Sequence, residues 1–267
     1  MKTFSLTQPT HGRIPILLSV PHCGTVIPED LKKEFDPRQI EALDDTDWFV
    51  DQLYDFAPVM GITLLSATVS RWVIDLNRNP DDQPLYTDGR VITGLCPVTD
   101  FLGIPLYKDQ RAAVDQKEVE RRRKLFFQPY HQQISQSLDD LQNIFGKVLL
   151  WDCHSIRQRV PSIRKDPFPD LILGDADGTS ASPGLSEMTL RNLEGDNRVV
   201  AHNEPFKGGY ITRQYGKPAQ NIHALQLEMS KVNYMDDSER LYNKPRADRV
   251  REMLKRNFEE LATLLLT

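Results

Sequence analysis

Two histidines and an acidic cluster lie near the ends of apolar segments in this chain, and together they could bind a metal ion. His22 and His154 each follow a short apolar run, and Asp45 and Asp47 lie close together in the sequence. Two imidazoles and one carboxylate, with a fourth position open to water, form the ligand set of a catalytic zinc site. A second carboxylate, not bound to the metal, can take a proton from that water and pass it to a leaving group. Glu228, on a segment where polar and apolar residues alternate, fits that role.

Each of these residues also has an ordinary structural explanation when it is considered alone. His22 could accept a hydrogen bond within a loop, Asp47 could begin a helix, and Glu228 could form an ion pair on a strand. The chain contains neither an HExxH nor a CxxC motif, so the ligands are not grouped in the sequence. The hypothesis of a metal site therefore depends on a fold that brings these segment ends together.

Four arginines form a second group of candidate functional residues near the same segment ends. They are Arg71, Arg78, Arg157 and Arg213. Arginine suits bidentate recognition of carboxylates and stabilisation of a developing oxyanion. Several arginines around one metal imply a small anionic substrate, with two carboxylates as the simplest case. For any one of them, pairing with a surface carboxylate is the alternative.

The elements that must position these residues are predicted from hydrophobic patterning. Short apolar or half-apolar runs predict strands over residues 14–20, 62–69, 71–78, 148–151, 171–174, 210–213 and 224–229. Helical spacing is found over residues 48–56, 115–145 with a break at Pro129, 186–192, and 238–265 with an interruption at Pro245. Residues 79–110 contain many turn formers and predict a long ordered loop, which could be a lid. Strands that alternate with helices favour one α/β domain over residues 1–267, with a mostly parallel mixed sheet flanked by helices.

Composition limits the class of partner and the cellular location. The chain has 267 residues, a formal net charge of −5 and no basic stripe, so we expect no nucleic-acid partner. No apolar run approaches the ~20 residues that span a bilayer, so we expect no membrane segment. Three cysteines without a CxxC motif and an N-terminus unlike a signal peptide favour a reducing, cytoplasmic location. The oligomeric state cannot be read from these features.

Six segments in order along the chain resemble motifs of the N-formylglutamate amidohydrolase family. These segments are Pro21-His22-Cys23-Gly24-Thr25, Asp45-Thr46-Asp47-Trp48, Arg71-Trp72-Val73-Ile74-Asp75-Leu76-Asn77-Arg78, Trp151-Asp152-Cys153-His154-Ser155-Ile156-Arg157, Gly208-Gly209-Tyr210-Ile211-Thr212-Arg213 and Gln226-Leu227-Glu228. The resemblance runs from about residue 14 to residue 236. It implies hydrolysis of N-formyl-L-glutamate to formate and L-glutamate, at the end of a route of histidine degradation. It also implies one divalent metal ion per chain, expected to be zinc.

The layout is more distantly similar to the zinc carboxypeptidase fold of succinylglutamate desuccinylase and aspartoacylase, a phosphorylase/hydrolase-like architecture. This likeness implies that His154 is a metal ligand and Glu228 the general base. It further implies that Arg71 polarises the scissile carbonyl, while Asn77 and Arg78 hold a substrate carboxylate. We expect Arg213 and Arg157 to contribute to the same substrate site.

One position departs from the pattern of those acylases. There, the first histidine ligand is followed three residues later by a glutamate ligand, whereas this chain has Thr25 three residues after His22. The carboxylate ligand must therefore come from another segment. We assign Asp47 to this role, with Asp45 as the alternative.

Three other functions remain open from the sequence. The same chemistry could act on an N-acetyl or N-succinyl amino acid, because the sequence does not determine the size of the acyl pocket. A binding protein for acidic amino acids could keep the arginines without turnover, although intact His22, His154 and Glu228 argue against it. A cysteine hydrolase could use Cys23 or Cys153 beside a histidine.

Overall fold

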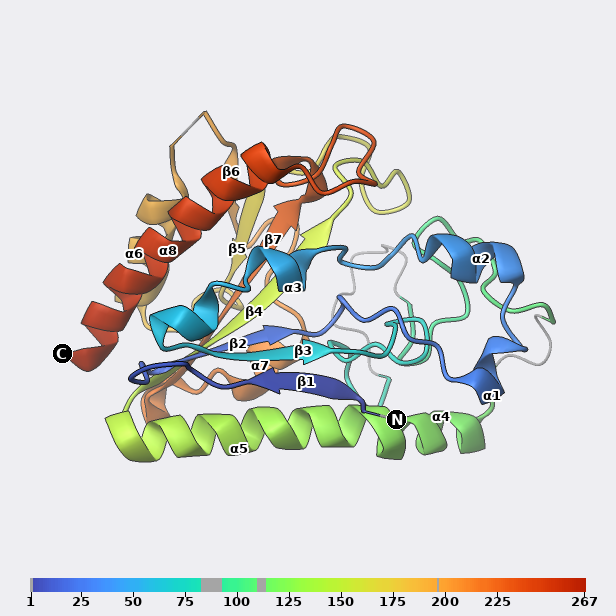
Figure 1. Cartoon of the computed structure of the whole chain (residues 1–267), viewed down its shortest axis with the longest axis horizontal. Coiled ribbons are helices and arrows are strands. Elements are labelled where there is room, and N and C mark those ends of the chain that lie inside the picture. Colours follow the sequence, from blue (N-terminus) through green and yellow to red (C-terminus); the bar gives the residue numbers. More distant parts are fainter. Residues whose placement is uncertain (1, 83–92, 110–113, 196) are drawn as a thin grey trace.

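A seven-stranded sheet forms the centre of the computed structural model, which describes residues 2–82, 93–109, 114–195 and 197–267 (Figure 1). The order of the strands across the sheet is β1-β3-β2-β4-β7-β5-β6. The strands are β1 (Phe4–Thr7), β2 (Ile16–Val20), β3 (Thr63–Ala67), β4 (Val148–Ile156), β5 (Leu171–Gly174), β6 (Val200–His202) and β7 (Ile222–Ser230).

The central strands β3, β2, β4 and β7 run parallel to one another. β1 runs antiparallel to β3 at one edge, and β5 runs antiparallel to β7 near the other, with β6 parallel to β5. Parallel strands need crossover connections, which in this chain contain the helices. The prediction of an α/β fold with a mostly parallel mixed sheet is confirmed.

Helices cover both faces of the sheet and bury its two apolar sides. The helices are α1 (Glu29–Lys32), α2 (Pro37–Ala42), α3 (Val50–Leu53), α4 (Gln116–Arg122), α5 (Gln128–Phe145), α6 (Pro183–Leu193), α7 (Tyr210–Tyr215) and α8 (Lys244–Leu266). Side chains of α3, α6 and α8 pack on one face, where Trp151 of β4 meets Phe258 of α8 edge to face at 5.2 Å. Side chains of α5 and α7 pack on the opposite face, and Figure 1 shows α5 and α8 on opposite sides of the sheet.

Successive side chains of each central strand point to opposite faces of the sheet. On β4, Leu149 and Trp151 contribute to the α8 side, whereas Leu150 contributes to the α5 side. Asp152 and His154 share the parity of Leu150, so their side chains project on the α5 face. These two polar residues are buried inside a strand whose other residues, apart from Ser155, are apolar.

Two predicted strands are wrong. Residues 71–78 form successive turns, and residues 210–213 belong to helix α7. Hydrogen bonds to distant residues stabilise α7, since the carbonyl and side-chain oxygens of Asn77 accept from the backbone amides of Tyr210 and Ile211. Such long-range capping leaves no local pattern that would predict a helix start.

The predicted break at Pro129 is also wrong, because the helix continues through it. A π-helical turn (Arg123–Phe127) joins α4 to α5 directly before Pro129. A widened turn is a common way to accommodate an irregularity inside a long helix. Pro245, predicted to interrupt a helix, instead lies in the first turn of α8, where a missing amide hydrogen costs nothing.

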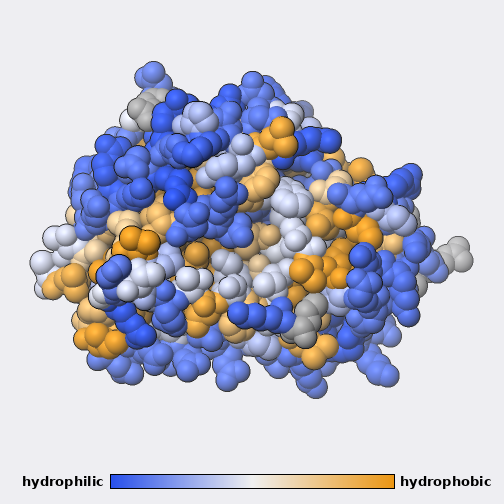
Figure 2. Space-filling model, viewed as in Figure 1, coloured by the Kyte–Doolittle hydropathy of each residue, from blue (hydrophilic) through white to orange (hydrophobic). Residues whose placement is uncertain are grey.

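The remaining features concern the loop and the surface. The described parts of the predicted 79–110 loop contain no helix or regular strand, and residues 83–92 and 110 lie outside the described residues. Figure 2 shows mostly hydrophilic side chains on the visible face, with hydrophobic ones in small groups, an ordinary protein surface. Within the described ranges, every helix is too short or too polar to cross a bilayer.

Candidate active site

Three neighbouring strands bring the predicted site residues to one edge of the sheet. His22 lies two residues after β2, His154 lies on β4, and Glu228 lies on β7 directly opposite His154. The pairing of Ser19 with Asp152 shows that β4 continues beyond the end of β2. His154 is therefore level with the residues that follow β2, and the two imidazoles lie 4.8 Å apart between ring centres.

Asp47 completes a compact group with the two histidines. The ligand atoms of His22, Asp47 and His154 all lie within 4.8 Å of one another, and all three residues are buried. Asp47 Oδ2 lies 3.7 Å from His22 Nδ1 and 3.2 Å from His154 Nδ1. The turn that carries Asp47 is held in place because its backbone amide donates to the His22 carbonyl at 2.9 Å.

The other ring nitrogen of each imidazole, Nε2, lies beside a carboxylate that is not Asp47. His22 Nε2 lies 2.7 Å from Asp75 Oδ1, and His154 Nε2 lies 3.0 Å from Asp152 Oδ2. With Nε2 beside these carboxylates, the Nδ1 atoms of both rings face Asp47. His22 Nδ1 is buried and has no hydrogen-bond partner among the described residues.

These observations fit a metal ion held by His22, Asp47 and His154. A buried nitrogen without a partner needs an explanation, and coordination of a metal ion by His22 Nδ1 would supply one. Metal-binding histidines almost always donate their other ring nitrogen to a carboxylate, carbonyl or water, as both do here. Two nitrogens and one oxygen are also the donor types of a catalytic zinc site.

Asp45, the alternative ligand, makes contacts in another direction. Its carboxylate accepts from Trp72 Nε1 at 2.9 Å and from the backbone amide of Phe101 at 3.1 Å. Burial raises the pKa of Asp45, although the charge of Arg71 opposes the shift. Asp47, and not Asp45, therefore lies between the imidazoles.

The electrostatics of the site favour positive charge between its carboxylates. Burial alone would raise the pKa of Asp47, but its contact with His154 and the nearby His22 imidazole outweigh burial and hold that pKa well below its usual range. Burial would lower the pKa of His154, but Asp152 and Asp47 outweigh it and raise that pKa well above its usual range. Binding of a metal ion would displace the proton on His154 Nδ1, because neutral imidazole is the ligand.

Glu228 and Arg71 lie beside this group without belonging to it. The Glu228 carboxyl group is buried and makes no hydrogen bond to another described residue. Burial raises the pKa of Glu228 although the positive charge of His154 opposes the shift. Arg71 Nη2 donates to Asp75 Oδ2 at 2.7 Å, and Arg71 Nη1 lies 4.0 Å from Asp47 Oδ1.

Asn77, predicted to hold substrate, has hydrogen bonds at both ends of its amide. Nδ2 donates to Asp152 Oδ2 at 3.0 Å, and Oδ1 accepts from the Ile211 amide at 2.7 Å. A Cβ atom at Gly209 would lie 2.4 Å from Asn77 Nδ2, so glycine at this position allows α7 to approach the site. These contacts give Asn77 a structural task between β4 and α7.

The other arginines that were predicted to bind substrate lie around the site and differ in their exposure to solvent. Arg78 Nη2 donates to Thr93 Oγ1 at 3.2 Å, with Nε 3.5 Å from Asp75 Oδ2. Arg213 is exposed on α7, where Nε donates to the Gly208 carbonyl at 3.0 Å. Arg157, partly exposed, forms an ion pair with Asp44 at 2.7 Å.

The cysteines have an environment that disfavours nucleophilic catalysis. Cys153 is fully buried on the α8 face of β4, and the Cys23 thiol lies 3.4 Å from the Ala67 carbonyl. Burial raises the pKa of both thiols well above the usual range. Since the thiolate is the nucleophile, neither residue is prepared for attack.

Three residues with direct consequences for the site were not assigned roles from the sequence. Asp152 could have been found, because it lies two residues before His154 and therefore on the same face of the strand. Asp75 meets His22 only through the tertiary fold. Lys231, buried just after β7, gives no signal in the sequence apart from its charge.

The fold and the site together define an α/β protein with a candidate metal centre at the carboxyl edge of a mostly parallel sheet. The chain belongs to the N-formylglutamate amidohydrolase family, whose sequence model matches residues 14–235. It is 43% identical over 232 residues to an N-formylglutamate deformylase of Pseudomonas putida, covering 85% of this chain and 84% of that protein. It is 41% identical over 256 residues to an N-formylglutamate deformylase of Pseudomonas aeruginosa, covering 94% and 93%.

Solved structures show the same fold. The crystal structure of N-formylglutamate amidohydrolase from Ralstonia eutropha JMP134 is 29% identical, with a TM-score of 0.85 over 99% of both chains. A gene product of Agrobacterium tumefaciens, Atu2144, is 17% identical with a TM-score of 0.73, over 98% of this chain and 96% of that one. The second likeness concerns the fold alone.

Proposed function

We propose that this protein is a metal-dependent hydrolase that converts N-formyl-L-glutamate to formate and L-glutamate. The observation that carries the proposal is the buried group of His22, Asp47 and His154 beside the Glu228 carboxyl group. The deformylase activity named for two relatives of over 40% identity supports the choice of substrate. The family resemblance adds a role at the end of a route of histidine degradation, which we include in the proposal.

The proposed ligands are His22, Asp47 and His154, with zinc as the expected metal. When bound, a divalent cation would supply Lewis acidity and make water a stronger nucleophile at neutral pH. Asp75 and Asp152 keep the two imidazoles in the tautomer that presents Nδ1 to the cation. The protein thus prepares the ligand geometry before the ion arrives.

Glu228 is the proposed general base and acid. Its carboxylate accepts a proton from the attacking water and then donates that proton to the amide nitrogen of the departing L-glutamate. A catalytic group works best when its pKa lies near the working pH, and burial shifts the pKa of Glu228 upward in this sense. Arg71, whose guanidinium is buried 4.0 Å from Asp47, is placed to donate to the developing oxyanion.

Arg78, Arg157 and Arg213 are the proposed substrate-binding cations. Carboxylate recognition by arginine would orient the formyl carbon toward the attacking water, which can contribute a large part of a rate enhancement. Asn77 is also proposed to contact the substrate. Its hydrogen bonds with Asp152 and with the Ile211 amide support a second role, which is to position α7.

The alternatives differ in measurable ways. A deacylase for acetyl or succinyl substrates has the same metal site, and only a substrate panel distinguishes it. A binding protein without turnover would not need Glu228 beside the metal ligands. A cysteine hydrolase conflicts with the raised pKa of both thiols.

The test is formate release from N-formyl-L-glutamate by purified protein, before chelation, after chelation and after zinc is added back. Loss of activity with chelator and its return with zinc is the expected result. N-acetyl-L-glutamate and N-succinyl-L-glutamate serve as comparison substrates. If a zinc-loaded sample cleaves one of those and not the formyl compound, the proposed substrate is wrong.

A further inference from the structure

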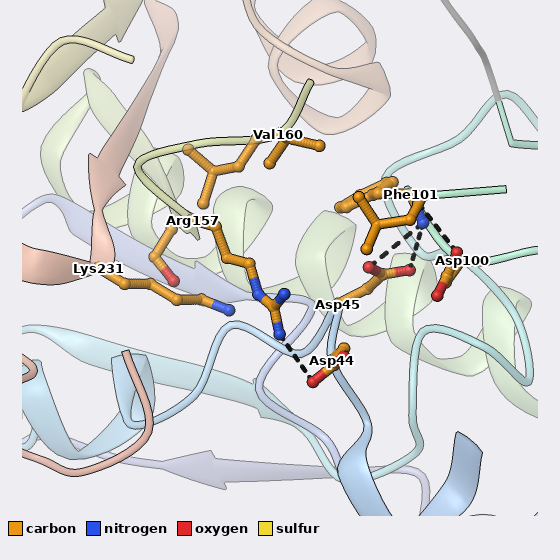
Figure 3. Close-up of a pocket in the computed structure, with 10 residues that line it drawn as sticks. Asp44, Asp45, Asp100, Phe101, Arg157, Val160 and Lys231 are labelled. Atoms are coloured by element: carbon orange, nitrogen blue, oxygen red, sulfur yellow. Dashed lines mark hydrogen bonds and ion pairs between the residues drawn. The ribbon is translucent and has the colours of Figure 1, made fainter. Parts of the chain in front are cut away.

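A pocket beside the candidate metal centre contains a buried lysine that the mechanism above does not use. The pocket is narrow, with a cavity volume of about 20 Å³, and it is lined by Asp44, Asp45, Asp100, Phe101, Leu102, Ser155, Ile156, Arg157, Val160 and Lys231. Figure 3 shows Lys231 and Arg157 entering it from one side, opposite Asp45 and Phe101. Lys231 Nζ donates to the carbonyl of Thr46, the residue before Asp47, so the pocket lies near this proposed metal ligand.

Lys231 has too few partners for a buried cation. Its side chain is 2% exposed, and among the described residues Nζ has a single hydrogen bond, to the Thr46 carbonyl at 2.7 Å. An ammonium group has three donors, and burying its charge without a paired anion is costly. Burial accordingly lowers the pKa of Lys231, although the charge of Asp47 opposes the shift.

The acidic residues of the pocket already have other partners. Asp45 accepts from Trp72 and Phe101, and Asp100 Oδ1 accepts from the amides of Leu102 and Ile104. Asp44 pairs with Arg157, in an ion pair where the side chains are 37% and 34% exposed. Such exposed pairs contribute little stability, so Arg157 can exchange this partner at small cost.

The walls of the pocket suit an aliphatic chain that ends in a carboxylate. Phe101, Leu102, Ile156 and Val160 supply apolar surface, and the two cations stand together at one side. A second and larger pocket of about 230 Å³, lined in part by Trp48 and Phe49, shares Asp44, Arg157 and Lys231 with the first. Mostly apolar pockets with a few placed charges are typical of small-molecule sites.

We propose that Lys231, assisted by Arg157, binds the side-chain carboxylate of the substrate and so selects acidic amino acids. The methylene groups of that side chain would lie against the apolar wall, and the α-carboxylate would lie near Arg78 and Arg213. This inference rests on the proposed function and names the residue that determines its side-chain specificity.

The test compares Lys231→Met with the wild type on two substrates, N-formyl-L-glutamate and its neutral analogue N-formyl-L-glutamine. Methionine keeps the length of the side chain and removes its charge. We expect kcat/KM for the glutamate substrate to fall roughly 10- to 100-fold, as for a lost hydrogen bond to a charged group. The value for the glutamine substrate should change little. Lys244→Met, which removes an exposed lysine at the start of α8, is the matched control and should match wild type.

An equal loss on both substrates would overturn the proposal and give Lys231 a structural task at the Thr46 carbonyl. The zinc content of each variant shows whether the loss of Lys231 also disturbs the proposed metal ligands. If Lys231→Met does not fold, Arg157→Met provides the same comparison at a partly exposed position. There too, a selective loss on N-formyl-L-glutamate is expected, and an equal loss on both substrates counts against the pocket.

Calorimetric titration with L-glutamate and L-glutamine separates this inference from the proposed function. If the wild type releases no formate, the proposed function fails. A preference for L-glutamate that disappears in Lys231→Met would still support the subsite. The absence of any such preference in the wild type would refute it.

Discussion

Replacing Asp152 with alanine tests whether the buried carboxylates prepare the histidines for metal binding. Asp152 is fully buried on β4, and its Oδ2 atom holds His154 Nε2 at 3.0 Å and accepts from Asn77 Nδ2 at the same distance. Without this acceptor, His154 can adopt the other tautomer, in which Nδ1 carries the proton and cannot bind a metal. The substitution leaves all three proposed ligands in place.

The expected losses of zinc affinity and of folding stability follow from the contacts that Asp152→Ala removes. Loss of a partner that orients a ligating histidine typically weakens metal affinity about 10- to 100-fold, or about 1.4–2.7 kcal/mol. Removal of Asp152 leaves Asn77 Nδ2 with only the long contact to Gln226 Oε1 at 3.5 Å as an oxygen acceptor, and should cost a further ~1–3 kcal/mol of folding stability, with or without metal. Asp152→Asn retains an oxygen acceptor and the side-chain volume, so its zinc affinity should fall between alanine and wild type.

The assay is a zinc titration in competition with a chromophoric chelator, together with urea denaturation of the metal-free protein. Asp175→Ala is a matched control. Asp175 is also buried and contacts a histidine and an asparagine, His202 at 2.9 Å and Asn203 at 2.7 Å, but it lies at the end of β5. The control should lose stability and keep wild-type zinc affinity. Wild-type zinc affinity in Asp152→Ala would refute the orienting role of this carboxylate.

Three further predictions concern catalysis, pH and the core. Glu228→Gln should bind zinc like wild type and lose about 10²- to 10⁴-fold in kcat; near-normal turnover would remove Glu228 from the mechanism. Burial lowers the pKa of His131 to about 4, so the unfolded state binds more protons below pH ~6.5. The free energy of unfolding in urea should therefore fall by about 2 kcal/mol from pH 7 to 5, and a smaller fall is expected in His131→Gln; equal pH profiles would contradict this. Phe258→Ala, which removes the ring against Trp151, should cost about 3–5 kcal/mol in the same measurement, and a loss below 1 kcal/mol would contradict that packing.

Several features of the fold could be predicted from the sequence because they depend on local burial patterns. The apolar runs that became β2, β3, β4, β5 and β7 are buried in the structure, as continuous hydrophobic runs in parallel sheets should be. The long helical pattern before β4 is confirmed as α4 and α5 with a π-helical turn between them. Strand alternation also indicated correctly that Gln226 and Glu228 face away from the apolar neighbours on β7.

The failures share a different physical origin. Residues 71–78 are half apolar, as a half-buried strand is, but several of their polar side chains are buried against partners elsewhere in the chain. Asp75 contacts His22, and Asn77 contacts Asp152 and α7. Helix α7 begins where Asn77 accepts from its first amides, 134 residues away in the sequence. No local rule contains this information.

The sequence by itself determined the types of chemistry available: two imidazoles, several carboxylates and a set of arginines on an α/β framework. Only the tertiary structure decided which of them meet. Asp47 rather than Asp45 lies between the imidazoles, because the Asp45 carboxylate is held by Trp72 and Phe101. Lys231 became a candidate for substrate recognition only when its burial beside Arg157 was known. Residue types fix the reactivity that a side chain can have, whereas distances and burial, set by the packing of the whole chain, decide whether that reactivity is used.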